Sequence, residues 1–521
     1  MKDYADSIAF LGQWGRFQQT VFFLLCASIM PNGFGAFTLV FVNDTPTHHC
    51  LVPDVNLTQD WQSAIIPVQV VNGKLEQSKC SRYRLDVVRN LSAQGYIPGR
   101  DVNLTELEQE RCVDGWSYST DIYESTIVSE FDLVCSEQWK QPFTSTVFFL
   151  GVLCGCFFSG QLSDRFGRKP VLFATIAVQT VFTFIQVFSS SWLMFTILLF
   201  INGLGQMSNF VAALVLGAEI LTGSVRILYS SMGTMLGFAT GYMILPLLAY
   251  FLRNWKSLLL ALSVPALAYL PFWWFIPESP RWLLSQGKVE EAEAIVRKAA
   301  KWNKVQAPQV VFEDCSANDT KTKENYDIFD LLRNSSIRMT TLILCFVSFT
   351  MITGYYCLSF NTSQLHADPY ISCFISAAVE VPAYISSWLA LRYFPRRLSV
   401  ISTLLVAAVS LFLIQLVPQG LSNLSLALEM LGKYSITTGA SMMFTYTAEL
   451  YPTVLRNTAT GVCTTVSRLG SCITPFLLDM KSFGRPLPET IQQMSRRGRI
   501  KCPCISRKHT PVPVVLLDNP L

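Results

Sequence analysis

Gly160-Gln-Leu-Ser-Asp164-Arg165-Phe-Gly167-Arg168-Lys169 is the stretch that decides the fold. It is a short basic loop between two apolar segments of about 20 residues, the length with which a helix crosses a bilayer. Glycine permits a tight turn and a close approach of helices, and Asp164 can pair with the cations across the helix ends. The loop therefore indicates two consecutive membrane helices joined on the cytoplasmic side, where arginine and lysine accumulate.

The composition of the whole chain agrees with a helical membrane protein. Of its 521 residues, 51% are hydrophobic and only 15% are charged, against roughly a quarter in soluble proteins. The mean hydropathy is +0.36. The net charge of +4 is small, and the basic residues lie between apolar runs rather than on one face, so a nucleic-acid partner is not expected.

Runs of about 18 or more largely apolar residues predict eleven helical spans. The first has no convincing signal-peptide cleavage site, so we expect it to stay in place with residues 1–16 in the cytoplasm. Basic residues after spans two, four, eight and ten place those loops inside. The predicted spans are 17–42, 142–162, 171–191, 193–217, 230–252, 256–276, 338–360, 370–391, 399–417, 422–447 and 457–478.

A long loop, 43–141, separates the first two spans and is predicted to be extracellular. It holds three sequons for N-glycosylation, at Asn56, Asn90 and Asn103. An even set of four cysteines in an extracellular loop indicates two disulfides, with three pairings that the sequence cannot separate. These cysteines are Cys50, Cys80, Cys112 and Cys135.

Two matching strings indicate that the chain is built from two halves. Glu219 and Arg226 follow span four, and Glu449 and Arg456 follow span ten with the same spacing. Parallel repeats of six spans are typical of transporters that rock around a central site. We therefore expect a first half at 17–276, a cytoplasmic linker at 277–337 and a second half at 338–478.

The loop from Gly160 to Lys169 resembles the signature of the major facilitator superfamily, and Pro277 to Trp282 resembles a second mark of its sugar- and organic-ion-carrying branch. Over nearly the whole chain, the closer resemblance is to the organic cation/carnitine transporters. The resemblance implies an all-α membrane protein with the major facilitator fold, twelve helices in two halves around a central cavity. The resemblance to the organic cation/carnitine transporters also rests on the strings Cys112-Val-Asp-Gly-Trp116, Glu380-Val-Pro-Ala-Tyr384 and Thr447-Ala-Glu-Leu-Tyr-Pro452.

The end of the chain departs from this family pattern. After Leu478 the sequence reaches Ser482-Phe483-Gly484 almost at once, whereas in the family a similar string follows span twelve. The twelfth span is therefore missing, which we interpret as a splice or gene-model variant. An odd number of spans places the basic tail 479–521 outside, against the positive-inside rule, and the sequence leaves that conflict open.

Arg468 is the first candidate for binding a substrate. It lies midway along span eleven, and no acidic residue of that span precedes Asp479. A charge at that depth costs about 2.5–3.5 kcal/mol on insertion scales, so a functional role is the default hypothesis. Its guanidinium can hold a carboxylate by two hydrogen bonds; the alternative is a structural pair with Glu380 or Glu429. The family resemblance favours the first, because carnitine-type carriers have arginine at the matching position.

Amide and aromatic side chains complete the predicted site. Amides suit a zwitterion or a partly dehydrated Na⁺, and the alternative is hydrogen bonding between closely packed helices. Aromatic faces attract a quaternary ammonium, and a helix break at Asn32 frees backbone carbonyls. Lys433 is expected to pair with Glu429, four residues earlier. The candidates are Gln179, Gln206, Asn209 and Asn32 among the amides, with Tyr355, Tyr356, Phe238, Tyr242 and Tyr446 among the aromatics.

Charged residues at the cytoplasmic helix ends are expected to lock the inward and outward states. They are Asp164, Arg165, Arg168, Glu219, Arg226, Glu278, Arg281, Glu449 and Arg456.

These patterns predict secondary transport of carnitine-like zwitterions and organic cations by alternating access at the plasma membrane. Na⁺ coupling stays open, and neither a cofactor nor a metal site is expected. The sequence offers no metal-ligand cluster and no catalytic arrangement of Ser, His and Asp, so we do not expect an enzyme. The alternative is a transport-inactive variant that is retained in the endoplasmic reticulum or that assembles with a full-length relative and regulates it.

Overall fold

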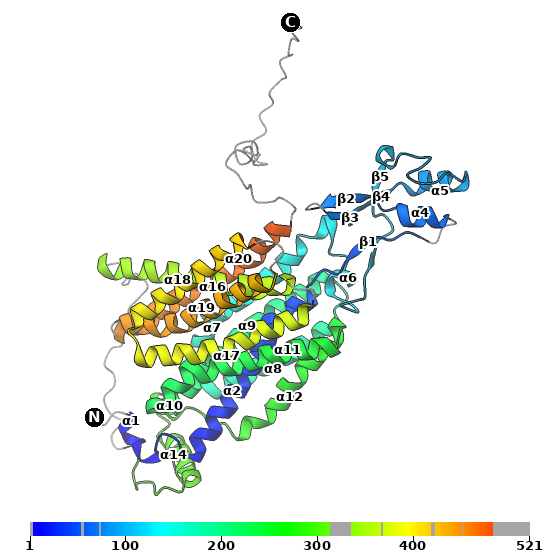
Figure 1. Cartoon of the computed structure of the whole chain (residues 1–521). Helices are drawn as coiled ribbons and strands as arrows, with labels where there is room; N and C mark the ends of the chain where they lie inside the picture. Colours follow the sequence, from blue (N-terminus) through cyan, green and yellow to red (C-terminus); the bar gives the residue numbers. More distant parts are fainter. Residues whose placement is uncertain are drawn as a thin grey trace, which may run out of the picture. The chain divides into compact units, whose positions relative to one another are not determined.

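The computed structural model describes residues 4–53, 57–71, 74–312, 335–365, 368–417, 422–451 and 453–482. The chain divides into two compact units, 1–477 and 478–521; of the second, the last turn of one helix is described. Long helices dominate the first unit (Figure 1).

The first half is built from helices that follow the apolar runs of the sequence closely. A tight turn at Gly167, with φ of 100°, ends α7 and begins α8, as the opening motif predicts. The elements are α1 (Tyr4–Ser7), η1 (Ala9–Leu11), α2 (Arg16–Phe37), α3 (Leu39–Val42), α7 (Lys140–Phe166), α8 (Arg168–Val187), α9 (Trp192–Ile220), α10 (Gly223–Leu228), η4 (Tyr229–Gly233), α11 (Thr234–Phe251), α12 (Trp255–Tyr269) and η5 (Leu270–Trp274).

Two helices follow the first half within the predicted linker, α13 (Pro280–Ser285) and α14 (Val289–Asn303). The second half follows, and α17 packs against both α19 and α11, so that the halves meet along α11 and α17. Its helices are α16 (Ser335–Leu365), α17 (Pro369–Tyr393), α18 (Arg396–Leu416), α19 (Ser422–Leu450) and α20 (Thr453–Ser482).

The helices confirm the membrane class. Nine stretches of the described residues are long and apolar enough to cross a bilayer, and each coincides with a predicted span. The two remaining predicted spans are the helices α19 and α20, of 29 and 30 residues. These two are less apolar because they carry serines, threonines and the charged residues Glu429, Lys433 and Arg468 in their interior.

Close helix crossings in the first half depend on glycine. Gly33 of α2 and Gly241 of α11 lie where the two backbones touch, and a Cβ on either would collide with a backbone carbonyl oxygen of the other helix. Gly151 of α7 and Gly203 of α9 form a second such crossing. Small residues that let backbones approach are a recurring means of packing helices in membranes.

The helix break expected at Pro31-Asn32-Gly33 is wrong. The helix α2 continues through these residues to Phe37. Side chains of α9 meet the carbonyls of this region: Gln206 Nε2 donates to Asn32 O at 2.9 Å and Asn209 Nδ2 donates to Ser28 O at 3.0 Å. These two side-chain bonds join α9 to α2 on either side of Pro31.

The long loop between the first two spans, which the sequence predicts to be extracellular, forms a small domain of short elements, which the all-α prediction did not include. Its three two-stranded antiparallel sheets pair β1 with β6, β2 with β3 and β4 with β5. The elements are β1 (His48–Cys50), α4 (Gln59–Ala64), β2 (Val68–Val71), β3 (Lys74–Gln77), β4 (Ser81–Tyr83), α5 (Leu85–Ala93), η2 (Leu104–Glu106), β5 (Gln109–Arg111), β6 (Trp116–Tyr118), α6 (Ile127–Glu130) and η3 (Cys135–Glu137).

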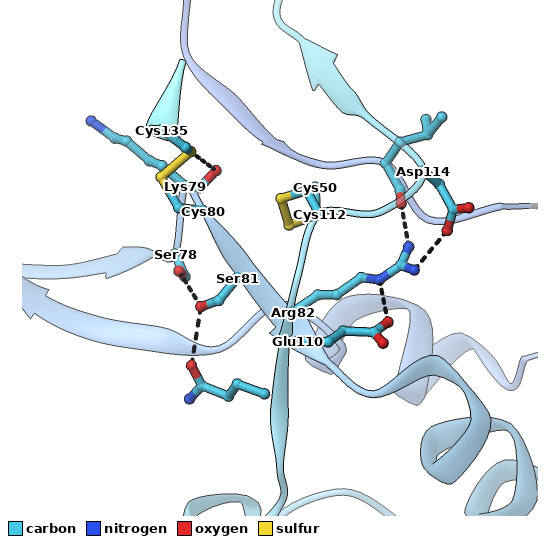
Figure 2. Close-up of a disulfide and its surroundings, with 12 residues drawn as sticks. Cys50, Ser78, Lys79, Cys80, Ser81, Arg82, Glu110, Cys112, Asp114 and Cys135 are labelled. Carbon is cyan, nitrogen blue, oxygen red and sulfur yellow. Dashed lines mark hydrogen bonds and ion pairs between the residues drawn. A yellow bond between two sulfur atoms is a disulfide. The ribbon is translucent and has the colours of Figure 1, made fainter. Parts of the chain in front are cut away.

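Two disulfides and one buried arginine hold this domain together (Figure 2). The disulfides join Cys50 to Cys112 and Cys80 to Cys135, which selects one of the three open pairings. Arg82 is 2% exposed, and it donates to Glu110 Oε1 at 2.8 Å and to Asp114 Oδ2 at 2.6 Å. Cross-links of this kind are needed where a small domain cannot build a large core.

Candidate functional site

Arg468 of α20 lies between the two halves of the chain. Its Nη1 donates to Tyr356 Oη at 3.3 Å, while its buried Nε has no hydrogen-bond partner among the residues that the structure describes. Within the described residues, Arg468 takes part in no salt bridge, and the alternative partner Glu380 is bound to another cation. The structure therefore leaves this guanidinium without a carboxylate.

Aromatic rings from both halves surround this position. The rings of Tyr355 and Tyr356 on α16 lie 5.1 Å apart, and Phe149 of α7 lies 4.7 Å from Tyr356. Phe37 of α2 stacks on Tyr242 of α11 with 3.9 Å between ring centroids. We call these five residues the aromatic cluster; Phe37 and Phe149 were not predicted, since nothing in their own helices distinguishes them from packing residues.

Two of the predicted aromatic candidates lie at different distances from this cluster. Phe238 is half-buried, with its ring 6.1 Å from that of Phe37. Tyr446 packs against a separate cluster around Met443 and Tyr451, so the structure does not bring it to the other rings.

A buried ion pair lies beside the aromatic cluster. Lys433 Nζ of α19 is 3.4 Å from Glu380 Oε1 of α17, and both side chains are fully buried. Sequence spacing suggested Glu429 as the partner of Lys433, but the ion pair is formed with Glu380, and Glu429 accepts from Asn361 Nδ2 at 3.4 Å. Glu429 does act on Lys433 through its charge, but the closer carboxylate comes from α17, because helical spacing reports neighbours on one helix only.

The predicted amides gather inside the first half. Asn209 Nδ2 donates to Asn32 Oδ1 at 3.2 Å, and Asn32 Nδ2 and Asn209 Oδ1 are buried without partners. Gln179 and Gln206 line a cavity of about 60 Å³ between α2, α8, α9 and α12. The residues that line this cavity do not include Arg468 or the tyrosine pair. The amides thus form a second polar site. Some of their hydrogen-bonding groups are already used in contacts between α2 and α9.

The predicted cytoplasmic charges come together in part. Arg168 donates from Nε and Nη2 to the two oxygens of Glu219, at 3.2 and 3.1 Å, and pairs with Asp164 at 2.8 Å. Glu278 accepts from the backbone N–H groups of Arg168 and Lys169, each at 3.1 Å. Burial raises the pKa of the Glu278 carboxyl above its ordinary value, although these N–H groups oppose the rise.

The other predicted lock residues take different places. Arg165 lies over the ring of Phe166, and the side chains of Arg226 and Arg281 are exposed. Glu449 is bound by Arg396, at 3.0 and 3.2 Å, which the sequence analysis did not include among the lock residues. The side chain of Arg456 lies outside the described residues.

The predicted glycosylation sites that can be located are accessible. Asn90 on α5 and Asn103 before η2 are exposed, and Asn56 lies outside the described residues. No group of His, Cys, Asp and Glu suited to a metal ion occurs in the part of the chain that the structure describes. The chemistry on offer is recognition: a guanidinium for an anion and tyrosines for a cation.

Comparison with known proteins gives consistent matches. The model of the family described as "Sugar (and other) transporter" matches residues 108–481. Organic cation/carnitine transporter 2 of Rattus norvegicus is 49% identical over 531 residues, covering 96% of this chain and 95% of that protein. Solute carrier family 22 member 4 of Mus musculus is 50% identical over 491 residues, covering 94% and 89%.

Solved structures give the same fold. The inward-open xylose transporter XylE from E. coli superposes with a TM-score of 0.56 at 13% identity, covering 89% of this chain and 90% of that one. At that identity the likeness concerns the fold alone.

Proposed function

The chain belongs to the family of sugar (and other) transporters, and from that premise we propose that it carries carnitine-like zwitterions and organic cations by alternating access. It is a multi-pass membrane protein, and we place its activity at the plasma membrane. The observation that carries the proposal is Arg468, whose guanidinium interacts with Tyr356 of the second half and Cys156 of the first and, among the described residues, has no acidic partner within salt-bridge distance.

A zwitterion fits the two ends of this site. The substrate carboxylate binds Arg468, because a two-pronged contact satisfies a guanidinium that otherwise stays buried at a cost. The quaternary ammonium has no N–H to donate and binds the faces of tyrosines, with about 0.5–2 kcal/mol for each cation–π contact. Tyr355 and Tyr356, 5.1 Å apart, span the distance between the two ends.

The gate on the extracellular side consists of contacts between the two halves, whereas the ion pairs on the cytoplasmic side hold each half together. On the extracellular side, Tyr370 of α17 donates to Ile122 O at 2.9 Å and stacks on Phe41 of α3 at 5.4 Å. On the cytoplasmic side, the ion pairs Arg168–Glu219 and Arg396–Glu449 fix helix ends within each half. Alternating access requires the first set of contacts to open while each half stays intact, as rigid-body rocking implies.

Na⁺ coupling is a further part of the proposal. Gln179 and Gln206 line the cavity of the first half, Gln206 also donates to Asn32 O, and among the described residues the buried Asn209 Oδ1 has no hydrogen-bond partner. Hard cations prefer oxygen ligands. A partly dehydrated Na⁺ at these amides would stabilise the polar groups that the fold leaves unpaired.

A transport-inactive variant is the second candidate function. The alignment with the rat relative spans 531 residues, more than the 521 of this chain, so that relative has positions without a counterpart here. Among the described residues, the second half has five long helices, α16 to α20, against six stretches of membrane-spanning length in the first half. A chain lacking one helix would be retained in the endoplasmic reticulum or would associate with a complete relative.

Uptake of labelled carnitine, with and without Na⁺, tests these alternatives in cells whose surface protein is quantified. Uptake above untransfected cells that falls to background in Arg468→Ala, at equal surface amount, is the expected result. Surface protein that takes up neither carnitine nor tetraethylammonium contradicts transport and favours the regulatory variant. Arg392→Ala, at an exposed position on the cytoplasmic end of α17, is the matched control for loss of an arginine.

A further inference from the structure

Lys433 connects the two halves of the chain. Its Nζ donates to Ser376 Oγ of α17 in the second half and to Tyr242 Oη of α11 in the first, the latter at 3.4 Å. Tyr242 Oη also lies 3.2 Å from Ser376 Oγ. The lysine is fully buried, and these contacts stabilise its charge together with Glu380, Cys373 and Glu429.

The ammonium of Lys433 also lies against the rings of Tyr242 and Tyr355. Nζ lies 4.8 Å from the centroid of the Tyr242 ring and 5.8 Å from that of Tyr355, both within the range of cation–π attraction. Tyr355 in turn donates to Glu380 Oε1 at 2.7 Å. Two rings and a carboxylate around a cation are the surroundings that a quaternary ammonium requires.

Lys433 lies close to Arg468, the residue proposed to bind the substrate carboxylate. Tyr355, under the Lys433 ammonium, is adjacent to Tyr356, which accepts from Arg468. The two cations therefore flank one tyrosine pair. A ligand with an ammonium and a carboxylate that reaches across this pair meets Arg468 at one end and Lys433 at the other.

We propose that Lys433 determines specificity by acting as a tethered occupant of the cation position over Tyr242 and Tyr355, from which a substrate ammonium has to displace it. The inference rests on the proposed function and names which ligands that site prefers. A cation without a carboxylate gains nothing to offset the displacement, whereas a zwitterion also gains the contact with Arg468. Displacement further removes the bond to Tyr242, and so loosens a contact between the halves when substrate binds.

Binding to the purified full chain tests this without requiring transport. The probes are tetramethylammonium and glycine betaine, which share the quaternary ammonium and differ in the carboxylate. Each is titrated while the unfolding temperature is followed, because a ligand that binds the folded state raises it. In Lys433→Met we expect the affinity for tetramethylammonium to rise about tenfold and that for betaine to change by less than about threefold.

Two variants keep the test decisive. Lys433→Arg retains the tethered cation and is expected to bind tetramethylammonium as weakly as the wild type. Lys433→Gln removes the charge, keeps a donor for Ser376 and leaves Glu380 in place for the probe, and it replaces the methionine variant if that one does not fold. An unchanged or weaker affinity for tetramethylammonium in a folded lysine-free variant overturns the proposal.

The outcomes also separate this proposal from the transport function. A rise in tetramethylammonium affinity together with an absence of carnitine uptake would reject transport and keep the role of Lys433. Carnitine uptake by the wild type, together with an unchanged affinity for tetramethylammonium in the lysine-free variant, would reject the role of Lys433 alone. Failure of the wild type and every variant to bind either probe would reject both.

Discussion

Two corners of the chain that the sequence predicts to be cytoplasmic use the same ion pair in different surroundings. In the first half, Arg168 at the start of α8 binds Glu219 at the end of α9, with side chains 10% and 15% exposed. In the second, Arg396 at the start of α18 binds Glu449 near the end of α19, with side chains 41% and 46% exposed. The two halves thus share an Arg–Glu ion pair at equivalent places, but the pair is more deeply buried in the first half than in the second.

The linker after the first half accounts for part of this difference. Glu278 accepts from the backbone at the start of α8, and Trp282 Nε1 donates to Asp164 O at 2.9 Å. Lys169 lies 4.4 Å from the centroid of the Trp273 ring. These contacts cover the first corner and remove it from water. Since the value of an ion pair depends on its burial, equal sequence strings need not contribute equally.

The largest expected effect follows from Arg168→Ala. It leaves the carboxylate of Glu219 partly buried without its cation, for which a loss of about 3–5 kcal/mol is typical. We expect a marked fall in the unfolding temperature of the purified chain and in its amount at the cell surface. Arg165→Ala, which removes an exposed arginine three residues earlier, is the control and should leave both near wild type. Equal behaviour of the two variants would contradict the account of the corner.

Glu278→Ala is expected to have a smaller effect. It removes the acceptor of the N–H groups of Arg168, Lys169 and Ser279. Loss of such an acceptor costs about 1–3 kcal/mol where the donors are buried. Glu278→Gln keeps one oxygen as an acceptor and should restore most of the stability in the same thermal unfolding measurement. If Glu278→Ala leaves the unfolding temperature unchanged, the linker does not stabilise the first corner.

Arg396→Ala should have the smallest effect. Exposed ion pairs contribute about 0–1 kcal/mol and weaken with salt. We expect little change in the unfolding temperature, and the small difference from wild type should vanish in high salt. A loss as large as that of Arg168→Ala would show that the two corners are equivalent after all.

Much of the helical fold could be predicted because apolar length and positive loops are local properties. The spans from 17–42 to 399–417 match helices within a few residues. The equivalence of Glu219 and Glu449 was also visible as a repeated spacing, and Arg168 was among the predicted lock residues, whereas Arg396 was not. Each carboxylate binds the arginine at the start of the preceding long helix rather than the one that follows it at the repeated spacing, and only the packing of α8 on α9 and of α18 on α19 reveals that.

The candidate site was predictable where a single residue carries the information. Arg468 stood out because an unpaired charge inside a span is costly wherever it points. The partner of Lys433 could not be found, because Glu380 is distant in sequence and approaches through the packing of α17 on α19. Phe37 and Phe149 were missed for the same reason, since an apolar ring in a membrane helix is ordinarily a packing residue.

The preference for a carboxylate tests the central claim most directly. Carnitine and its methyl ester share the quaternary ammonium, and only carnitine carries the negative charge. Their binding to the purified wild type and to Arg468→Ala can be compared by ligand-dependent thermal stabilisation. We predict that the wild type binds carnitine at least about tenfold more tightly than the ester and that Arg468→Ala shows no preference. A preference that survives in Arg468→Ala would contradict the role of Arg468 as the carboxylate site.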